Sequence, residues 1–135
     1  MYKEKTQNQL RSWLSNKKSQ SKKKDFFVEF EPLSFFKWYL IQKKVCHYCG
    51  ISEKEQFDLI SKGHLKSKRF FTSEHGTRGR HLEIDRKDPK GPYSDNNCVL
   101  SCYMCNNNKS DLFNENQYLE LINKNRVVYL RNLLK

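Results

Sequence analysis

The stretch from Arg80 to Phe113, RHLEIDRKDPKGPYSDNNCVLSCYMCNNNKSDLF, decides the fold. Residues 81–85 alternate polar and apolar side chains with a period of two, which predicts a half-buried strand. Prolines, glycine, serine and asparagines crowd residues 89–97, so the chain turns there. Residues 98–101 predict a short returning strand, and a helix begins within residues 102–106. The stretch therefore predicts a hairpin with a helix packed across it.

This arrangement brings two oxygen-bearing side chains together. Asp85 lies at the end of the first predicted strand, and Asn106 lies near the start of the predicted helix. Facing each other across a small cleft, they would offer a carboxylate oxygen and a carboxamide oxygen. Such ligands suit a hard divalent cation. We therefore predict that Asp85 and Asn106 hold a catalytic Mg²⁺ or Mn²⁺ ion.

Two Cys-x-x-Cys pairs flank the predicted hairpin. A single pair could be a redox pair or a chance occurrence, but two pairs at this spacing predict a tetrahedral zinc site with four cysteine ligands. Four thiolates close the coordination sphere, so we expect a structural zinc ion rather than a catalytic one. The predicted ligands are Cys46, Cys49, Cys102 and Cys105. The fifth cysteine, Cys98, is expected to be a small buried hydrophobe on the second strand.

At these residues the chain resembles the HNH, or ββα-metal, endonuclease family, and within it the branch that contains the restriction enzyme PacI. The resemblance covers about residues 38 to 113. It implies an α+β fold: a small single domain with a ββα-metal (HNH) hairpin-helix core, a four-cysteine zinc site and flanking helices. The matching motifs are Cys46-His47-Tyr48-Cys49-Gly50-Ile51, Asp85-Arg86-Lys87-Asp88, Gly91-Pro92-Tyr93-Ser94, Asn97, and Cys102-Tyr103-Met104-Cys105-Asn106-Asn107-Asn108-Lys109-Ser110.

The resemblance also implies roles for single residues. In most HNH enzymes a histidine that activates water follows the strand aspartate, whereas this chain has Arg86 there. Arginine stays protonated, so Arg86 is expected to hold the scissile phosphate through bidentate contacts. Tyr39 is the first candidate for the general base, because Trp38-Tyr39 matches a pair in the PacI branch with a one-residue difference in spacing. His81, on the strand that carries Asp85, is the second candidate.

The charge balance points to a polyanionic partner. The chain of 135 residues has 26 basic and 15 acidic residues and a formal net charge of +11. A lysine-rich surface can simply aid solubility, but so large an excess is more typical of a nucleic-acid-binding domain. The candidate DNA-binding residues are Lys22, Lys23, Lys24, Lys66, Lys68, Arg69, Arg78, Arg80 and Lys109.

We divide the chain into a basic N-terminal helix or arm and a nuclease domain. These parts comprise residues 1–24 and 25–135, the latter with zinc knuckles at 46–49 and 102–105, the ββα-metal motif at 81–113 and a C-terminal helix at 115–134. No apolar run reaches membrane-spanning length, and the N-terminus lacks the apolar core of a signal peptide. We therefore expect no membrane partner and a reducing, cytoplasmic location for a bacterial or phage-encoded protein.

Several local patterns lie outside the hairpin. Residues 25–31 alternate like a strand, and Pro32 suits the first turn of a helix with a stripe of Leu33, Phe36 and Leu40. A helix is also expected from residue 53, anchored by two apolar residues and ending near a glycine. We expect a break near residues 123–125 in the C-terminal helix. The expected core residues are Phe26, Phe30, Phe36, Trp38, Phe57 and Ile60.

The leading functional prediction is a metal-dependent DNA endonuclease of the HNH class that acts on double-stranded DNA. It could be a small restriction enzyme or a phage or mobile-element nuclease. If it cuts a palindrome, a two-fold homodimer is expected, because symmetric half-sites mirror protein symmetry. The alternative is a catalytically inactive, zinc-stabilised nucleic-acid-binding module, which Arg86 keeps open. A purely structural zinc protein would leave Asp85, Asn106 and the net charge unexplained.

Overall fold

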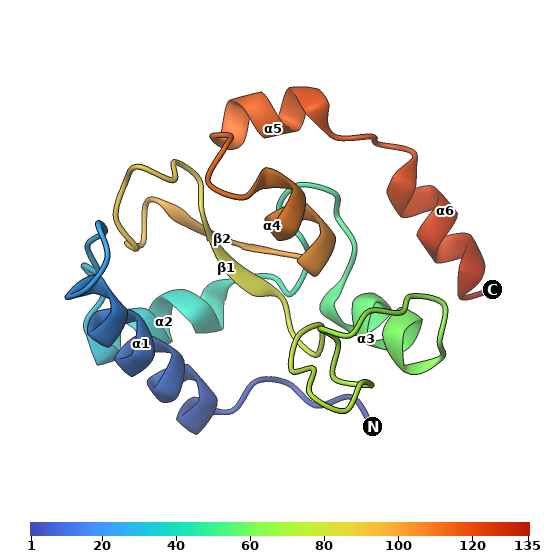
Figure 1. Ribbon diagram of the computed structural model, residues 1–135, viewed down its shortest axis with the longest axis horizontal. Helices are drawn as coiled ribbons and strands as arrows, with labels where there is room; N and C mark the ends of the chain where they lie inside the picture. Colours follow the sequence, from blue (N-terminus) through green and yellow to red (C-terminus); the bar gives the residue numbers. More distant parts are fainter.

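The computed structural model describes residues 1–135 and has an α+β fold, as the sequence predicts. Figure 1 shows the hairpin near the centre, with α1 and α2 below it and α4 and α5 above it. No helix combines the length and the apolar character needed to cross a membrane. The elements are α1 (Gln7–Ser21), α2 (Pro32–Ile41), α3 (Glu53–Ser61), β1 (Glu83–Arg86), β2 (Cys98–Ser101), α4 (Tyr103–Lys109), α5 (Glu115–Leu121) and α6 (Arg126–Leu133).

The hairpin of β1 and β2 is antiparallel and pairs Asp85 with Val99. Its first strand begins two residues later than the sequence predicts. Asn97 ties the connecting loop together, since its Nδ2 donates to the carbonyl of Pro92 at 2.8 Å and its Oδ1 accepts from the backbone N–H of Asp88 at 3.1 Å. Helix α4 packs against β1. The predicted hairpin with a helix across it is confirmed.

The buried face of α2 differs from the predicted one. The helix buries Phe35, Trp38 and Tyr39, whereas Leu33 and Leu40 are 66% and 74% exposed. The predicted stripe is therefore wrong. The helix is apolar on most of its circumference, so periodicity alone cannot choose its inner face. The aromatic residues form the buried face because they pack against other aromatic rings, and the rings of Phe30 and Phe35 are 5.1 Å apart.

Residues 25–31 do not form the predicted strand. The segment makes a single parallel bridge, between Val28 and Tyr93, so it has no partner along its length. The predicted alternation holds, because Phe26, Val28 and Phe30 pack inward while Phe27 is exposed. The segment is thus an extended connector that rests on the hairpin loop.

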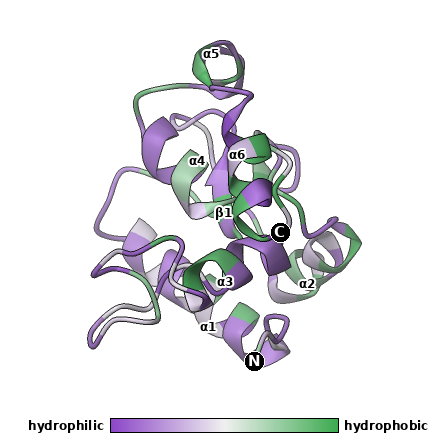
Figure 2. Cartoon of the chain, turned by 90° about the vertical axis from the view of Figure 1, so that its right-hand side faces the viewer, coloured by the Kyte–Doolittle hydropathy of each residue, from purple (hydrophilic) through white to green (hydrophobic).

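The remaining helices frame this centre. α1 begins with a capping box between Thr6 and Gln9 and packs on α2. α3 buries Phe57 and Ile60, as predicted. The C-terminal segment is two helices, α5 and α6, with the break at the predicted place. Hydrophilic residues cover most of the chain, and hydrophobic ones come in short stretches (Figure 2). A core of this size benefits from an additional crosslink.

Candidate functional site

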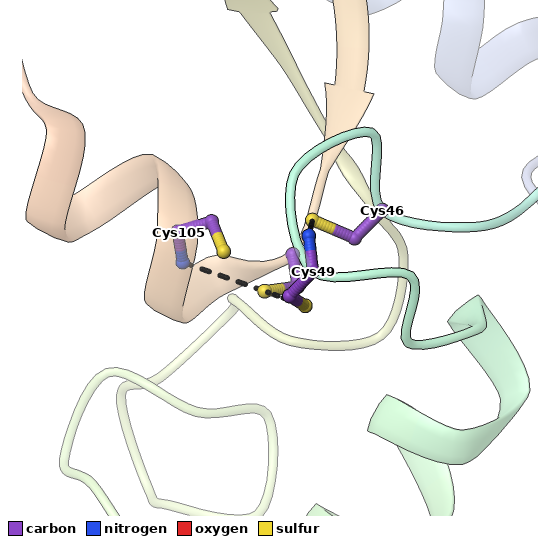
Figure 3. Close-up of side chains that lie close together, drawn as sticks. Cys46, Cys49 and Cys105 are labelled. Atoms are coloured by element: carbon purple, nitrogen blue, oxygen red, sulfur yellow. Dashed lines mark hydrogen bonds between the residues drawn. The ribbon is translucent and has the colours of Figure 1, made fainter. Parts of the chain in front are cut away.

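The four cysteines of the two Cys-x-x-Cys pairs converge on one point. Their Sγ atoms all lie within 4.8 Å of one another, and those of Cys49 and Cys102 are 3.8 Å apart. Sulfur atoms in a tetrahedral site with zinc–sulfur distances of about 2.3 Å are about 3.8 Å apart. Figure 3 shows the sulfur atoms gathered between the loop of residues 46–49 and the start of α4. The cluster therefore fits a zinc ion.

Groups around the cluster orient the sulfur atoms and balance their charge. The backbone N–H groups of Cys49 and Cys105 donate to the Sγ atoms of Cys46 and Cys102, at 3.5 and 3.4 Å. Arg126 of α6 donates to Cys105 Sγ at 2.7 Å. Its guanidinium would offset part of the negative charge that four thiolates leave on a bound Zn²⁺. The loop of residues 46–49, α4 and α6 thus meet at this cluster.

Cys98 is separate from the cluster. It lies buried on β2, and burial raises the pKa of its thiol to about 12. A thiol with so high a pKa stays protonated at neutral pH, which makes it a poor metal ligand. The structure places Cys98 as a small buried hydrophobe, as expected.

Asp85 projects from β1 into a buried polar cluster. Its side chain is 5% exposed, and its Oδ2 accepts the hydroxyl of Tyr48 at 2.6 Å. Lys109 Nζ lies 3.3 Å from Oδ2 and 3.4 Å from Oδ1. Burial raises the pKa of Asp85, while the Tyr48 hydrogen bond and the Lys109 charge act in the opposite direction. The Lys109 contacts are longer than the roughly 2.8 Å of a close charge-assisted bond, so a cation would share this carboxylate with Lys109 and Tyr48.

Lys109 is enclosed in the protein. Sequence reasoning assigns it to DNA, but its side chain is fully buried and its Nζ also donates to the carbonyl of Arg86 at 2.7 Å. Lys109 comes three residues after Asn106, so both project from the face of α4 that packs on β1. The structure thus does not bring this ammonium to the surface, where a phosphate could reach it.

Asn106 contacts a residue that sequence reasoning missed. Its Nδ2 donates to Glu83 Oε1 at 2.6 Å, and no protein group donates to its Oδ1. Glu83 in turn receives two bonds from Arg78, at 2.9 and 2.5 Å. Glu83 and Asp85 are two residues apart on β1, so they share a face. That spacing is the sequence signal that could have identified Glu83.

Asp85 and Asn106 line the same cavity, which we call the β1 cavity. Its volume is about 520 Å³. The basic side chains on its walls outnumber the acidic ones, which makes it attractive to an anion. The cavity is lined by residues 77–86, by Lys5, Gln9, Trp13 and Lys17 of the N-terminal part, by Asn106, Ser110 and Asp111 of α4 and the following turn, and by Pro89 and Tyr93 of the hairpin loop.

Arg86 is fixed at the edge of this cavity. Its Nη1 donates to the carbonyl of Gly91 at 3.1 Å, and its guanidinium lies 4.7 Å from the centre of the Tyr93 ring and 5.4 Å from that of Phe26. One donor is used by the loop, so other N–H groups are left for a ligand. Arg86 is therefore a preoriented cation in the same cavity as Asp85.

The two candidate bases lie in different places. His81 lines the β1 cavity, and its Nε2 is 2.9 Å from the carbonyl of Lys3. Burial lowers the pKa of His81, which favours the neutral imidazole. Tyr39 lines a separate cavity beside α2, and its buried hydroxyl has no hydrogen-bond partner. Burial raises the pKa of Tyr39, which opposes formation of a phenolate.

The predicted DNA-binding residues fall into several groups. Arg78 and Arg80 line the β1 cavity. Lys66 and Lys68 line a shallow depression near the end of α3, and Arg69 is exposed beside them. The remaining three, Lys22, Lys23 and Lys24, are exposed just beyond the end of α1. Only the first group shares a cavity with Asp85 and Asn106.

The donor set of the β1 cavity suits the predicted divalent ion. Asp85 offers a carboxylate and Asn106 a carboxamide oxygen that accepts no protein hydrogen bond. Glu83 adds a second carboxylate beside Asn106. Hard oxygen donors of this kind are those that Mg²⁺ and Mn²⁺ prefer. The residues therefore fit such an ion.

Among solved structures, the chain is similar to the rare-cutting HNH restriction endonuclease PacI, with 26% sequence identity and a TM-score of 0.65. The match covers 86% of this chain and 73% of the PacI chain. No protein-family model matches the sequence, and no curated protein matches it. The four-cysteine cluster and the hairpin with its helix agree with this likeness. The chain thus resembles the HNH endonucleases, in particular PacI, and has a nuclease-like fold.

Proposed function

We propose that the protein is a metal-dependent DNA endonuclease of the HNH class that hydrolyses phosphodiester bonds. The observation that carries the proposal is the presence of Asp85 and Asn106 in one cavity with basic side chains on its walls. The likeness to PacI, an HNH restriction endonuclease, supports it. The net charge of +11 suits a polyanionic substrate.

Five residues of the β1 cavity have a role in this proposal. Asp85 and Asn106 hold Mg²⁺ or Mn²⁺, which when bound supplies positive charge against the phosphoryl oxygens and promotes ionisation of water. Arg86 binds the scissile phosphate through its free N–H groups and cannot act as a base. Glu83 orients the carboxamide of Asn106 through the 2.6 Å bond. Arg78 fixes Glu83 in turn.

His81 is the better-placed general base. It lines the cavity that contains Asp85, whereas Tyr39 lies outside it. Four residues of extended chain separate His81 from Asp85, which corresponds to about 13 Å. His81 would therefore act on a phosphate that lies over Glu83 and Asn106. Comparing His81→Gln with Tyr39→Phe separates the candidates, because the variant that loses the base slows cleavage more than it weakens DNA binding.

Plasmid cleavage tests the proposed activity. Wild-type protein with Mg²⁺ or Mn²⁺ should convert supercoiled plasmid to the open-circular or linear form, and EDTA should stop the reaction. Asn106→Ala should reduce the rate about a hundredfold or more, whereas Asn107→Ala, at the exposed neighbouring position, should keep it. Circular dichroism and zinc content confirm that both variants fold. Binding without any metal-dependent cleavage would favour the inactive zinc-stabilised module.

The biological setting follows from the same activity. We propose that the substrate is double-stranded DNA inside a cell and that the protein is a restriction-type or mobile-element nuclease. If its target is palindromic, two copies should act as a two-fold homodimer. Sequencing the ends from a digest of mixed genomic DNA gives the target and the cut symmetry. Sedimentation with the target duplex gives the number of copies bound.

A further inference from the structure

The β1 cavity has a second wall, formed by the N-terminal part of the chain. Lys5, Gln9, Trp13 and Lys17 all line it, opposite the segment that contains β1. Gln9, Trp13 and Lys17 are spaced by four on α1 and form one ridge, and Lys5 lies four residues before Gln9 in the segment that leads into the helix. Figure 1 shows α1 running beside the hairpin, on the side away from α4. None of the four belongs to the motif that holds Asp85 and Asn106.

We propose that this ridge binds the sugar-phosphate backbone of one strand of duplex DNA, next to the phosphate that is cut. The proposal rests on the proposed nuclease function and adds the residues that seat its substrate. From Gln9 to Lys17 the helix rises about 12 Å. One strand of B-form DNA rises about 3.4 Å per nucleotide, so the ridge spans about three to four nucleotides. Lys5, just before the cap residue Thr6, extends it.

The ammonium group of Lys17 is free to bind an anion. No carboxylate lies within 4 Å of it, whereas the neighbouring Lys18 is paired with Glu31 at 3.1 Å. Lys5 has no carboxylate within 4 Å either, but it is half-buried: burial lowers the pKa of Lys5, and the charges of Glu53 and Glu83 act in the opposite direction. Lys5 is also held in position. The segment before it is fastened by the hydroxyl of Tyr2, which donates to buried Glu53 at 2.5 Å.

The aromatic groups beside the ridge are already covered. Lys17 Nζ lies 5.0 Å from the centre of the Tyr93 ring, on which Arg86 also rests. The Trp13 ring stacks on Phe35 at 5.1 Å. Lys17 Nζ also lies 5.7 Å from the centre of the Trp13 ring. Unstacked bases of a single strand bind by stacking on aromatic faces, whereas these rings already contact protein side chains. The wall therefore presents cations to phosphates, which favours duplex DNA over single strands.

The test measures duplex binding without cleavage, as fluorescence anisotropy in EDTA over a range of salt concentrations. Each lost phosphate contact reduces the slope of log K against log salt by about 0.9. Lys5→Gln and Lys17→Gln should each lower affinity about fivefold to tenfold, and the double variant should lower the slope by about 1.8. The matched controls Lys3→Gln and Lys18→Gln should leave the slope unchanged. A single strand of the same sequence should bind more weakly than the duplex.

Two results would reject the proposal that this wall binds duplex DNA. One is an unchanged salt-dependence slope in the double variant, and the other is tighter binding of the single strand than of the duplex. The cleavage assay separates this proposal from the nuclease. If the wild type cuts plasmid and the double variant keeps the wild-type slope, only the DNA-binding role of the wall is rejected. If the wild type never cuts and the double variant has a reduced slope, the nuclease proposal is rejected and the DNA-binding role of the wall is supported.

Discussion

The cysteine cluster and the β1 cavity are both built for a cation, but they prepare for it differently. In the cluster, four sulfur atoms already converge within 4.8 Å and bond mainly to backbone N–H groups. In the cavity, Asp85 is paired with Lys109 and Tyr48, and Asn106 with Glu83. An ion there must compete with Lys109 and Tyr48 for the Asp85 carboxylate, whereas the Asn106 Oδ1 accepts no protein hydrogen bond. We therefore expect tight zinc binding in the cluster and weaker, exchangeable binding in the cavity.

The two regions are also mechanically linked. Tyr48, which binds Asp85, lies between Cys46 and Cys49, and Asn106 directly follows Cys105. A zinc ion in the cluster would hold together the loop that supports one oxygen ligand and the helix that carries the other. The cysteine cluster, which we call the closed site, thus sets the geometry of the β1 cavity, which we call the open site.

The largest expected effect comes from breaking the closed site. Cys102→Ser should lose zinc and unfold the protein, because structural zinc contributes roughly 10–16 kcal/mol in small domains, which exceeds or equals the whole stability of most domains. Cys98→Ala removes a buried thiol outside the cluster and should keep both zinc and fold. Circular dichroism and elemental analysis provide the readouts. A folded Cys102→Ser protein, or a zinc-free wild type that is stable, would contradict the comparison.

The next effect is inside the open site. Lys109→Met should destabilise the protein by about 3–5 kcal/mol at neutral pH, because Asp85 becomes a buried charge without a counterion. The loss of Lys109 raises the pKa of Asp85 further, so the variant is most stable at acid pH and loses stability as pH rises through that pKa. Urea unfolding at several pH values measures this.

The double variant Lys109→Met/Asp85→Asn is the matched control for that experiment. It replaces both charges with neutral side chains of similar volume, so it should regain much of the lost stability and have a flatter pH dependence. Cleavage should be absent in the double variant because the carboxylate of Asp85 is gone. Equal stability of the single and double variants would show that the two charges do not depend on each other.

Tyr48→Phe tests the link between the two regions. Losing the 2.6 Å bond to Asp85 should cost about 1–3 kcal/mol and raise the pKa of Asp85, because that bond favours the ionised carboxylate. The acid limb of the cleavage rate should therefore move to higher pH, with zinc content unchanged. Tyr129→Phe removes an exposed hydroxyl on α6 and should have little effect on either quantity. If the acid limb of the cleavage rate does not move in Tyr48→Phe, the proposed connection between the cysteine cluster and Asp85 through Tyr48 is wrong.

The smallest expected effect concerns the charge beside the cluster. Arg126→Met should weaken zinc binding about tenfold to a hundredfold while the protein stays folded in excess zinc. Lys124→Met, an exposed cation two residues before Arg126, should leave zinc affinity unchanged. Competition with a chelator measures both. Equal affinities in the two variants would show that the Arg126 contact does not matter to the ion.

Sequence spacing predicts the closed site well and the open site in part. Fixed spacing within each Cys-x-x-Cys pair identifies the cysteine ligands, and the hairpin brings the two pairs together. Asp85 and Asn106 line the same cavity, and their joint role as metal ligands stays a prediction. The burial of Lys109 could not be predicted from the sequence. Lysine is almost never buried without a partner, and the partner of Lys109, Asp85, lies 24 residues away in the chain.

The packing of the N-terminal half is the least predictable part. In α2 the apolar residues occupy most positions, so the inner face depends on aromatic partners supplied by α1 and by residues 26–30. The same holds for the ridge from Lys5 to Lys17. Its spacing of four is visible in the sequence, but only the tertiary position of α1 turns that ridge toward β1.

The central claim is that Asp85 and Asn106 together bind a divalent ion in the β1 cavity. Anomalous scattering from a crystal of the wild-type protein grown with Mn²⁺ tests it most directly. The account predicts a manganese peak between the carboxylate of Asp85 and the carboxamide of Asn106, separate from a zinc peak at the four cysteines. A zinc peak with no manganese between those two side chains, under conditions that support cleavage, would contradict it.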